Sequence, residues 1–517
     1  MRSLLALFVL GLAVSLTSCR NDFETVANTG ALEFSKDTVF LDTVFTNIGS
    51  STYNLRVYNR SNDDINIPTV GLAQGENSLY RLNVDGIPGK TFEDVVIRAK
   101  DSIFVFIETT IDIEQFAATG NQFLYTDQIQ FDSGGNQQDV ELVTLVQDAV
   151  FLFPERDADG VVETLNLGMD ANGDPVLIEG FILEDDQLNF TNEKPYVIYG
   201  YAAVDVGRTL TVDAGARIHF HANSGILVSN TASMQVNGAP STDPEALENE
   251  VIFEGDRLEP AFSDVPGQWG AIWLTPGSTG HVFTNTTIKN ATVGILMQSN
   301  DGSDTPTLTL SNTQIYNSSN IGLFAQTGFV DGENVVINNS GQSSLALSIG
   351  GRYNFRHCTF ANYWNDSFRS FAAVSIDNSV QISETETFDQ DLIEANFTNC
   401  IIYGNENIEL GLFDGGNAEF NFNFTNCLLR FNDIQGVFDE NPLYDFSNGV
   451  RYNNLVVNED PFFLAPFENQ LNISNDSGAN GLDLSGAPLV PFDILNVART
   501  APFDAGAYES VIFPDED

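Results

Sequence analysis

The stretch FTNTTIKN at residues 283–290 is the clearest copy of a short pattern that recurs through the second half of the chain. Each copy has an Asn-type anchor, then a small residue, then a large apolar residue two positions later, and then a turn residue. Five further copies are LSNTQIYN (310–317), GENVVINN (332–339), FRHCTFAN (355–362), FTNCIIYG (397–404) and FTNCLLRF (424–431). The anchors recur every 22 to 27 residues, apart from one interval of 42. This period is typical of a solenoid in which each repeat packs only on its neighbours.

The repeats have the composition of strands. Apolar residues alternate with polar ones, which is a period of two, and Asn-Gly, Asp-Gly and Gly-Gly turn signals separate the segments. Three short strands and three bends in each turn would give the coils of a parallel β-helix, stacked about 4.8 Å apart. The sequence therefore predicts an all-β chain with a long solenoid.

Stacking would align equivalent residues of successive coils into columns. The anchor column is Asn285, Asn312, Asn334, His357, Asn399 and Asn426. Asn side chains at bends bond to backbone groups and to each other, so we expect His357 to replace Asn structurally rather than to act as a base. The small residues that follow the last three anchors are Cys358, Cys400 and Cys427. We expect buried free thiols there, with a Cys400–Cys427 disulfide as the alternative.

Four stretches together resemble a known family. They are the strand-rich segment at 196–220, GQWGAIWL at 267–274, the NFTNC repeats, and DAGAYE at 504–509. The chain thereby resembles right-handed parallel β-helix repeat proteins, the pectate-lyase-like solenoids found among surface lipoproteins of Bacteroidota. The resemblance implies the handedness of the solenoid. It implies no single reaction, because that fold hosts lyases, hydrolases and adhesins.

The amino terminus has the pattern of an export signal. Residues 1–18 contain Arg2 and the apolar run LLALFVLGLAV, which is too short for a stable membrane span. Small residues before Cys19 resemble a lipobox, so we expect a lipoprotein signal peptide, cleavage before Cys19 and lipidation of Cys19. The alternative is an ordinary signal peptide followed by a chance cysteine. The expected location is the outer membrane, with surface display and a lipid anchor as the membrane contact.

The region between this signal and the repeats lacks the Asn-anchored pattern. After an anchor linker at 19–30, residues 31–150 predict an immunoglobulin-like β-sandwich. We expect its strands near residues 38–45, 53–58, 65–67, 79–84, 92–97, 103–109, 123–131 and 140–146. Residues 151–194 are interpreted as a join or N-terminal cap. Residues 195–517 are interpreted as the β-helix with a C-terminal cap over its last coil.

Composition limits the partners. The chain has 71 acidic and 21 basic residues, for a formal charge of −50, which disfavours nucleic acid because phosphate binding needs Lys and Arg. We expect no cofactor and no metal site. The segment starting at Asp170 begins like a calcium loop, but Phe181 stands where an EF-hand needs Glu, so only a structural Ca²⁺ stays open. His219 and His221 form a His-x-His pair without a visible third ligand.

One outward row of the repeats combines two cations with two tyrosines: Lys289, Tyr316, Tyr403 and Arg430. Sugar binding uses aromatic faces and hydrogen-bond donors, so this row is the predicted ligand-binding strip, with a solvated strand face as the alternative. Trp364 is added because it lies in an extra element, residues 363–394, that is either another coil or a loop. Loops on a rigid scaffold often carry binding sites.

The aligned outward rows do not gather the carboxylates that glycan-cleaving enzymes use. We therefore assign no catalytic residue. The preferred hypothesis is a non-enzymatic cell-surface lipoprotein that binds glycans or other surface polymers. The alternative is a polysaccharide lyase or glycoside hydrolase with divergent catalytic residues. The oligomeric state is not determined by the sequence.

Overall fold

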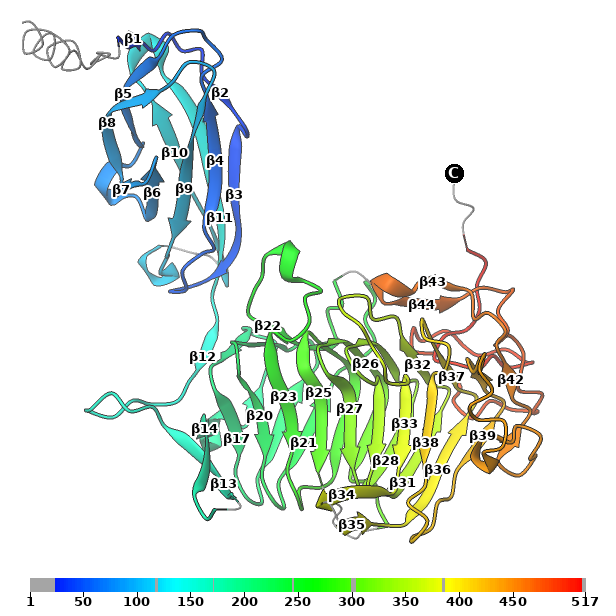
Figure 1. Ribbon diagram of the computed structural model, residues 1–517. Helices are drawn as coiled ribbons and strands as arrows, with labels where there is room; N and C mark the ends of the chain where they lie inside the picture. Colours follow the sequence, from blue (N-terminus) through cyan, green and yellow to red (C-terminus); the bar gives the residue numbers. More distant parts are fainter. Residues whose placement is uncertain are drawn as a thin grey trace, which may run out of the picture. The chain divides into compact units, whose positions relative to one another are not determined.

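The computed structural model describes residues 24–116, 120–170, 172–243, 246–298, 304–383 and 386–513, and it is all-β (Figure 1). The chain divides into two units, Met1–Asp148 and Ala149–Asp517, and each has its own hydrophobic core. Across the described ranges, none of the helices has the length and apolar character needed to cross a bilayer. The predicted signal peptide and Cys19 lie outside the described residues.

Helical structure in the described ranges consists of short 3-10 turns. They are η1 (Gly75–Asn77), η2 (Ile113–Gln115), η3 (Gly134–Asn136), η4 (Asp185–Gln187), η5 (Pro260–Phe262), η6 (Pro442–Tyr444) and η7 (Pro466–Glu468). Three of them, η5, η6 and η7, begin with Pro, whose fixed φ suits the first position of a helical turn.

Two sheets form the first unit and share one core. The larger sheet contains β1 (Val26–Ala27), β3 (Thr38–Phe45), β5 (Ile65–Leu72), β8 (Thr91–Ile97), β10 (Gln122–Phe131) and β11 (Gln138–Gln147). The smaller contains β2 (Glu33–Phe34), β4 (Tyr53–Tyr58), β6 (Tyr80–Val84), β7 (Ile87–Gly89) and β9 (Ser102–Thr109). Strands are present at all eight expected places, and their apolar alternation points one face of each sheet into the core.

The second unit is built from three ladders of parallel strands. The first contains β12 (Val150–Leu152), β16 (Tyr196–Ile198), β19 (Arg217–Phe220), β22 (Val251–Gly255), β29 (Val336–Ser340), β32 (Thr359–Asn362), β37 (Ile401–Gly404), β40 (Leu428–Leu429) and β42 (Val456–Val457). The second contains β15 (Asn189–Phe190), β18 (Thr209–Asp213), β21 (Ser233–Asn237), β28 (Phe329–Glu333), β31 (Gly351–Arg356), β36 (Leu392–Thr398), β39 (Asn423–Thr425) and β41 (Tyr452–Asn453). The long strands β24 (His281–Lys289) and β26 (Leu308–Ser318) belong to both.

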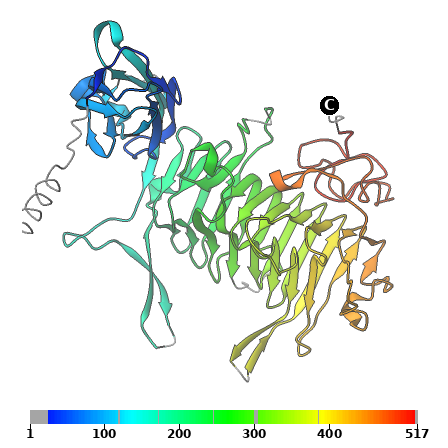
Figure 2. The same ribbon diagram turned by 45° about the horizontal axis from the view of Figure 1, so that its top comes forward.

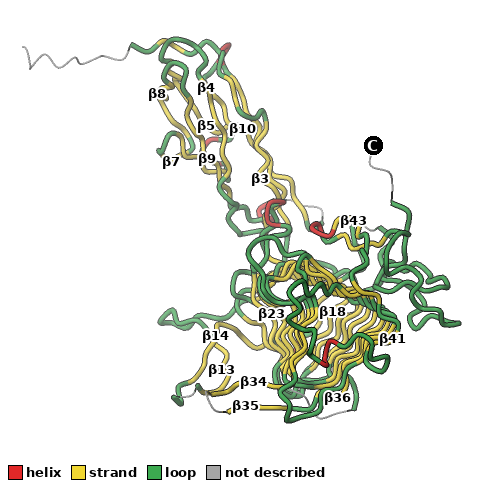
Figure 3. Tube along the Cα trace, turned by 45° about the vertical axis from the view of Figure 1, so that its right-hand side comes forward, coloured by secondary structure: helices red, strands yellow, loops and turns green. Residues whose placement is uncertain are grey.

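The third ladder completes each repeat. It contains β14 (Pro175–Ile182), β17 (Tyr201–Val204), β20 (Gly225–Val228), β23 (Trp269–Leu274), β25 (Ala291–Gln298), β27 (Ile321–Gln326), β30 (Leu345–Ser348), β33 (Val374–Asp377) and β38 (Leu410–Phe413). β13 (Thr164–Met169) pairs antiparallel with β14, so this end of the ladder is a hairpin. Figure 3 shows the strands of successive repeats as layers lying one behind another.

The stack begins earlier than the sequence suggested. β12 pairs in parallel with β16, and β14 pairs in parallel with β17. Residues 151–194 therefore contribute a first coil with strands in all three ladders, rather than only a join. The sequence pattern missed this coil because it lacks the Asn anchor.

The Asn anchors have the backbone conformation that their residue type favours. All six predicted anchors have φ between 42° and 55°, in the left-handed region that Asn tolerates better than most residues. Their amides bond from coil to coil: Asn312 donates to Asn285 at 3.3 Å, Asn334 to Asn312 at 2.9 Å, and Asn426 to Asn399 at 3.0 Å. The predicted structural role of His357 is confirmed, because its Nε2 accepts from the Asn399 amide at 2.9 Å.

A second amide ladder follows the first ladder's strands and was not predicted. Asn317 donates to Asn290 at 3.2 Å, and Asn339 donates to Asn317 at 2.8 Å. These residues also have positive φ values. They are the turn residues at the ends of the first three repeat copies, so their recurrence in the sequence was the available signal.

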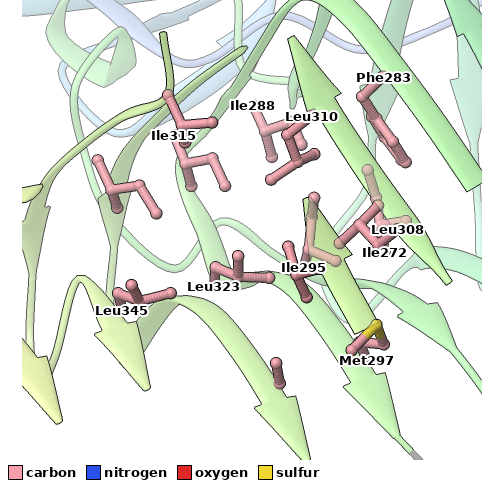
Figure 4. Close-up of a cluster of buried hydrophobic side chains, with 14 of the residues drawn as sticks. Ile272, Phe283, Ile288, Ile295, Met297, Leu308, Leu310, Ile315, Leu323 and Leu345 are labelled. Atoms are coloured by element: carbon pink, nitrogen blue, oxygen red, sulfur yellow. The ribbon is translucent and has the colours of Figure 1, made fainter. Parts of the chain in front are cut away.

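The interior between the ladders is filled by columns of apolar side chains (Figure 4). Ile288 and Ile315 occupy one column, and Phe283 and Leu310 occupy the next. The three cysteines Cys358, Cys400 and Cys427 are fully buried free thiols, which confirms the prediction of a packed column instead of a disulfide.

The 42-residue interval between His357 and Asn399 is one coil with two insertions. β31 pairs directly with β36, and β32 with β37, so no additional coil intervenes. The insertions are the loop that precedes β33 and the hairpin β34 (Ser379–Ser383) with β35 (Glu386–Asp389). Figure 2 shows this hairpin projecting from the stack, as the β13–β14 hairpin does.

The residues that cover the last coil directly follow the last repeat and precede the end of the chain. Aromatic residues of 431–446 cover that coil, and the Tyr444 hydroxyl accepts from the backbone N–H of Leu412 at 2.7 Å. The following residues, with β43 (Phe463–Ala465) and β44 (Gln470–Ile473), instead run back along the side of the stack. Arg499 donates to Asn334 at 3.0 Å, and the Gly506 N–H donates to the Asn399 carbonyl at 2.8 Å. We call residues 460–509 the C-terminal strap.

The buried His357 predicts a specific pH dependence. Burial, followed by the charge of Arg499, lowers the pKa of His357 from 6.5 to about 3, so the unfolded chain takes up a proton at a higher pH than the folded chain. Stability should therefore fall as the pH drops below 6.5, by up to about 1.4 kcal/mol per pH unit. His357→Asn removes this contribution and places an amide among the other anchors. Urea unfolding at pH 7 and pH 5 should show that the wild type loses about 2 kcal/mol more than the variant. Parallel losses in both proteins would contradict the assignment.

Candidate functional site

The predicted ligand strip lies in one row of the first ladder, but the C-terminal strap covers most of it. Register places Lys289, Tyr316 and Asn338 side by side on neighbouring coils. Tyr403 is buried with Ile473 and Ala505, and Tyr316 packs against the cluster of Leu471, Ala507 and Tyr508. The expectation that this row faces solvent is therefore wrong, because apolar strap residues occupy its outer side.

The two cations of the row are engaged by neighbouring groups. Lys289 Nζ lies 2.9 Å from Glu254 Oε2. Arg430 Nε donates to the Glu406 carbonyl at 2.7 Å, and its guanidinium lies over the Tyr403 ring at 5.3 Å from the centroid. These contacts give Lys289, Tyr403 and Arg430 structural partners within the unit.

Trp364 is part of the wall of the stack rather than an exposed binding side chain. It is buried, and its indole donates to Ser367 Oγ at 3.0 Å. The exposed aromatics of this insertion are Phe368 and Phe371. The loop that carries them is held by Arg369, which forms two bonds to the buried carboxylate of Glu409 at 2.7 and 2.9 Å.

The same row continues toward the start of the stack as a polar cluster. Register places His219 opposite Glu254, next to Lys289. Burial raises the pKa of Glu254, but the opposing interactions with His219 and Lys289 hold that pKa below its ordinary value. Burial is also the largest effect on His219 and lowers its pKa, so this imidazole is neutral at pH 7 and Lys289 is the cation that neutralises Glu254. RIHF at 217–220 and VIFEG at 251–255 share the apolar alternation of the repeats, but Ile218 and its partner Phe253 are 35 residues apart, outside the period of 22 to 27.

A second group beside the cluster links Arg217 to Glu250. Arg217 donates to the carbonyls of Glu250 and Leu247, each at 2.6 Å, and Thr287 donates to Glu250 Oε2 at 3.4 Å. Burial raises the pKa of Glu250, and the bond from Thr287 and the charge of Arg217 only partly oppose this shift. Glu250 and Glu254 therefore have pKa values shifted in opposite directions.

The two histidines of the His-x-His pair have different partners. His219 Nδ1 lies 3.3 Å from the Gly255 carbonyl, whereas His221 Nδ1 lies 2.8 Å from Asp256 Oδ2. Through the described part of the chain, no group of three His, Cys, Asp or Glu side chains is placed to hold a metal ion. His221 also stacks on Tyr199, with ring centroids 4.5 Å apart.

The first coil carries an open cavity of about 710 Å³ that the sequence analysis did not find. Its walls are anchored by the pairing of β12 with β16 and of β14 with β17. Its lining includes Phe151, Phe153 and Phe181, the acidic residues Glu155, Asp157, Glu163 and Glu184, and Arg156. We call it the first-coil pocket. The signal that could have found it is the FLFPERD segment at 151–157, which places rings and charges together.

The polar groups of the first-coil pocket are partly committed to its loops. The Glu163 N–H donates to the Glu155 carbonyl at 2.9 Å, and Arg156 donates to the Gly160 carbonyl at 3.4 Å. Asp157 Oδ1 accepts from the backbone N–H groups of Asp159 and Val161, each at 2.9 Å. Glu163 Oε2 accepts from the Glu155 N–H at 3.3 Å. Glu155 and Glu163 are exposed, so the other oxygens of these carboxylates are available as hydrogen-bond acceptors.

The calcium-like segment forms a turn closed by its own backbone. Asp170 Oδ1 accepts from the N–H groups of Asn172 and Asp174 at 2.8 and 2.9 Å. The bond from the Asp174 N–H, followed by that from Asn172, lowers the pKa of Asp170. This arrangement is an Asx-type turn. A structural Ca²⁺ at this segment stays a prediction from the sequence.

No family model matches the chain, and no curated protein matches its sequence. Several solved structures give distant matches. A family 123 glycoside hydrolase from Clostridium perfringens is 9% identical with a TM-score of 0.16, and the match covers 23% of this chain and 29% of that chain. The CooA pilin subunit from enterotoxigenic Escherichia coli is 12% identical with a TM-score of 0.16, over 23% of this chain and 97% of the pilin. The periplasmic chaperone SfaE is 9% identical with a TM-score of 0.15, over 29% and 82%. At these scores the similarities carry no argument about function.

The Arg369–Glu409 pair allows a test of how the insertion is held. Both side chains are buried, and burial raises the pKa of Glu409 despite the two bonds from Arg369. Arg369→Ala leaves a buried carboxylate without its partner, so the free energy of unfolding should fall by about 3–5 kcal/mol. The exposed pair Arg208–Asp185, 2.9 Å apart, provides the control. Arg208→Ala should change stability by less than about 0.5 kcal/mol. If urea unfolding showed equal effects of the two substitutions, burial would not determine the contribution of the ion pair to stability.

Proposed function

We propose that the chain is a lipid-anchored outer-membrane protein, displayed at the cell surface, that binds glycans without cleaving them. In this proposal the first unit is an immunoglobulin-like sandwich and the second a right-handed parallel β-helix of the pectate-lyase-like type. Three parallel ladders and the Asn anchors support the second assignment, and two sheets around one core support the first. The lipoprotein assignment rests on the sequence around Cys19.

The first-coil pocket is the observation that carries glycan binding. A volume of about 710 Å³ is large enough for a short oligosaccharide segment. The exposed ring of Phe153 offers apolar surface to the C–H faces of sugar rings, and the exposed carboxylates accept hydrogen bonds from hydroxyl groups. Four carboxylates against one Arg favour an uncharged glycan over an anionic one.

The polar cluster of the first ladder supports binding over cleavage. Glu254 is ion-paired with Lys289, and Arg217 is bonded to backbone carbonyls, so these groups are occupied in folding contacts. The alternative, a lyase or hydrolase, is favoured by one observation: the opposite pKa shifts of Glu250 and Glu254, which are typical of acid–base pairs. The alternative would be established if the wild type released reducing ends or unsaturated products from a polysaccharide and Glu250→Gln abolished that release. This result would contradict our proposal.

The pocket assignment predicts the effect of removing one ring. Phe153 is 60% exposed, so Phe153→Ala should leave the melting temperature nearly unchanged. Affinity for neutral polysaccharides should fall at least tenfold, because truncating an aromatic anchor often costs about 2 kcal/mol of binding energy or more. Phe413 on β38 is 61% exposed and lies outside the pocket lining, so Phe413→Ala is the matched control. The measurement is affinity electrophoresis in gels containing glucan, mannan, xylan or galactan. Equal retardation of both variants would rule out the pocket as the binding site.

The anchor assignment predicts the effect of removing one thiol. Cys19→Ser should move the protein from the membrane fraction to the soluble fraction, because lipidation requires the Cys19 thiol. Detergent partitioning and incorporation of a labelled fatty acid provide the measurement. Cys400→Ser, which changes a buried thiol of the second unit, should keep the label and serves as the control. Labelling of the Cys19→Ser protein would overturn the lipoprotein assignment.

A further inference from the structure

The smaller sheet of the first unit presents two exposed phenylalanines side by side. In β9, Ile103, Val105 and Ile107 point into the core, so the alternation of the strand directs Phe104 and Phe106 to the opposite face. These rings are 43% and 40% exposed, their centroids are 6.0 Å apart, and their planes differ by 13°. Because the core is filled by the other face, the fold does not require aromatic residues at these positions.

Guanidinium groups extend the two rings into a continuous stack across β4 and β9. Register places Arg56 opposite Phe104, and the Arg56 guanidinium lies 5.1 Å from the Phe104 centroid and 5.3 Å from the Tyr58 centroid. The Arg60 guanidinium also lies over the Tyr58 ring, 4.1 Å from its centroid. Cation–π contacts and cross-strand pairing hold these flat groups in place, so little side-chain freedom remains to be lost on binding.

Hydrogen-bonding groups border the stack. Asn54 and Asn83 are the cross-strand neighbours of Phe106, on β4 and β6. Arg60 is bound to Glu33 by two bonds of 3.0 Å, whereas Arg56 donates to Ser102 Oγ at 2.9 Å and forms no ion pair with any described residue. The face therefore combines flat apolar rings with amides and a guanidinium whose remaining N–H groups face no carboxylate partner. We call it the Phe104–Phe106 platform.

Charge limits what this platform can bind. The chain carries a net charge of −50, so a second copy of it, a nucleic acid or an anionic lipid surface meets long-range repulsion. An uncharged polysaccharide meets none. Its sugar rings have C–H faces that pack on aromatic rings, and their edges carry hydroxyl groups that pair with amides and guanidinium groups.

We propose that the Phe104–Phe106 platform is a second glycan-binding site, specific for a neutral polysaccharide. The proposal rests on the proposed function and adds to it a site in the first unit. Phe104 and Phe106 supply the stacking surface, and Arg56, Asn54 and Asn83 supply the hydrogen bonds. Two sites on one chain increase the retention of a polymer that engages both, because the second contact is made within an existing complex.

The test uses the complete chain after Cys19 in affinity electrophoresis with four neutral polysaccharides, namely glucan, mannan, xylan and galactan, and with anionic polygalacturonate. The variant is the double substitution Phe104→Ala with Phe106→Ala. Phe40→Ala is the matched control, because Phe40 is 49% exposed on β3 of the larger sheet in the same unit. Arg56→Lys tests the guanidinium, because Lys keeps the charge but loses the planar stack. Melting curves check that every variant is folded.

The double variant should melt like the wild type and lose at least tenfold in affinity for the neutral polymer that the wild type binds. Phe40→Ala should bind normally, and Arg56→Lys should bind more weakly. If the double variant bound with wild-type affinity while Phe153→Ala lost affinity, the platform would not be a glycan-binding site. The proposed function would stand. Retardation by polygalacturonate alone would overturn the assignment to a neutral glycan. Absence of wild-type retardation in every gel would overturn the proposed function itself.

Discussion

The left-handed bend at each Asn anchor is the constraint on which the stacked unit depends. A residue with positive φ turns the chain between the second and first ladders, and Asn tolerates this conformation while its amide remains free to bond along the stack. The donated bonds from Asn312 to Asn285 and from Asn334 to Asn312 then satisfy the polar groups that each bend would otherwise bury unpaired. Because the six anchored coils repeat the bend at the same place, their apolar columns between the ladders fall into register.

The C-terminal strap is the second element that shapes the surface. It binds the same anchors from outside, through Arg499 at Asn334 and through Asp483, which accepts from Asn399 at 2.8 Å. Its apolar residues cover the row that contains Tyr316 and Tyr403. As a result, the middle of the first ladder is a buried interface.

The few cationic side chains of the chain are largely used in contacts within the fold. The chain has few of them, and several are used within the fold: Lys289 by Glu254, Arg217 by backbone carbonyls, and Arg369 by Glu409. The Arg56 guanidinium is held differently, by the Ser102 hydroxyl and the rings of Phe104 and Tyr58. The two surfaces argued to bind glycan, the first-coil pocket and the Phe104–Phe106 platform, share exposed aromatic rings beside hydrogen-bonding groups.

The all-β class, the positions of the strands in the first unit, the repeat period, and the roles of His357 and the cysteine column could all be predicted from the amino-acid sequence. These features depend on local spacing, since a period of two, a turn residue and an anchor are encoded within a few neighbouring residues. Which face of a strand is exposed depends instead on tertiary contacts. The covering contacts join residues far apart in sequence, such as Asn338 with Asn469 at a separation of 131 and Arg499 with Asn334 at 165. A repeat pattern specifies the alternation of a strand but not the segment that packs on its outer side, so the predicted strip was covered and the first-coil pocket was missed.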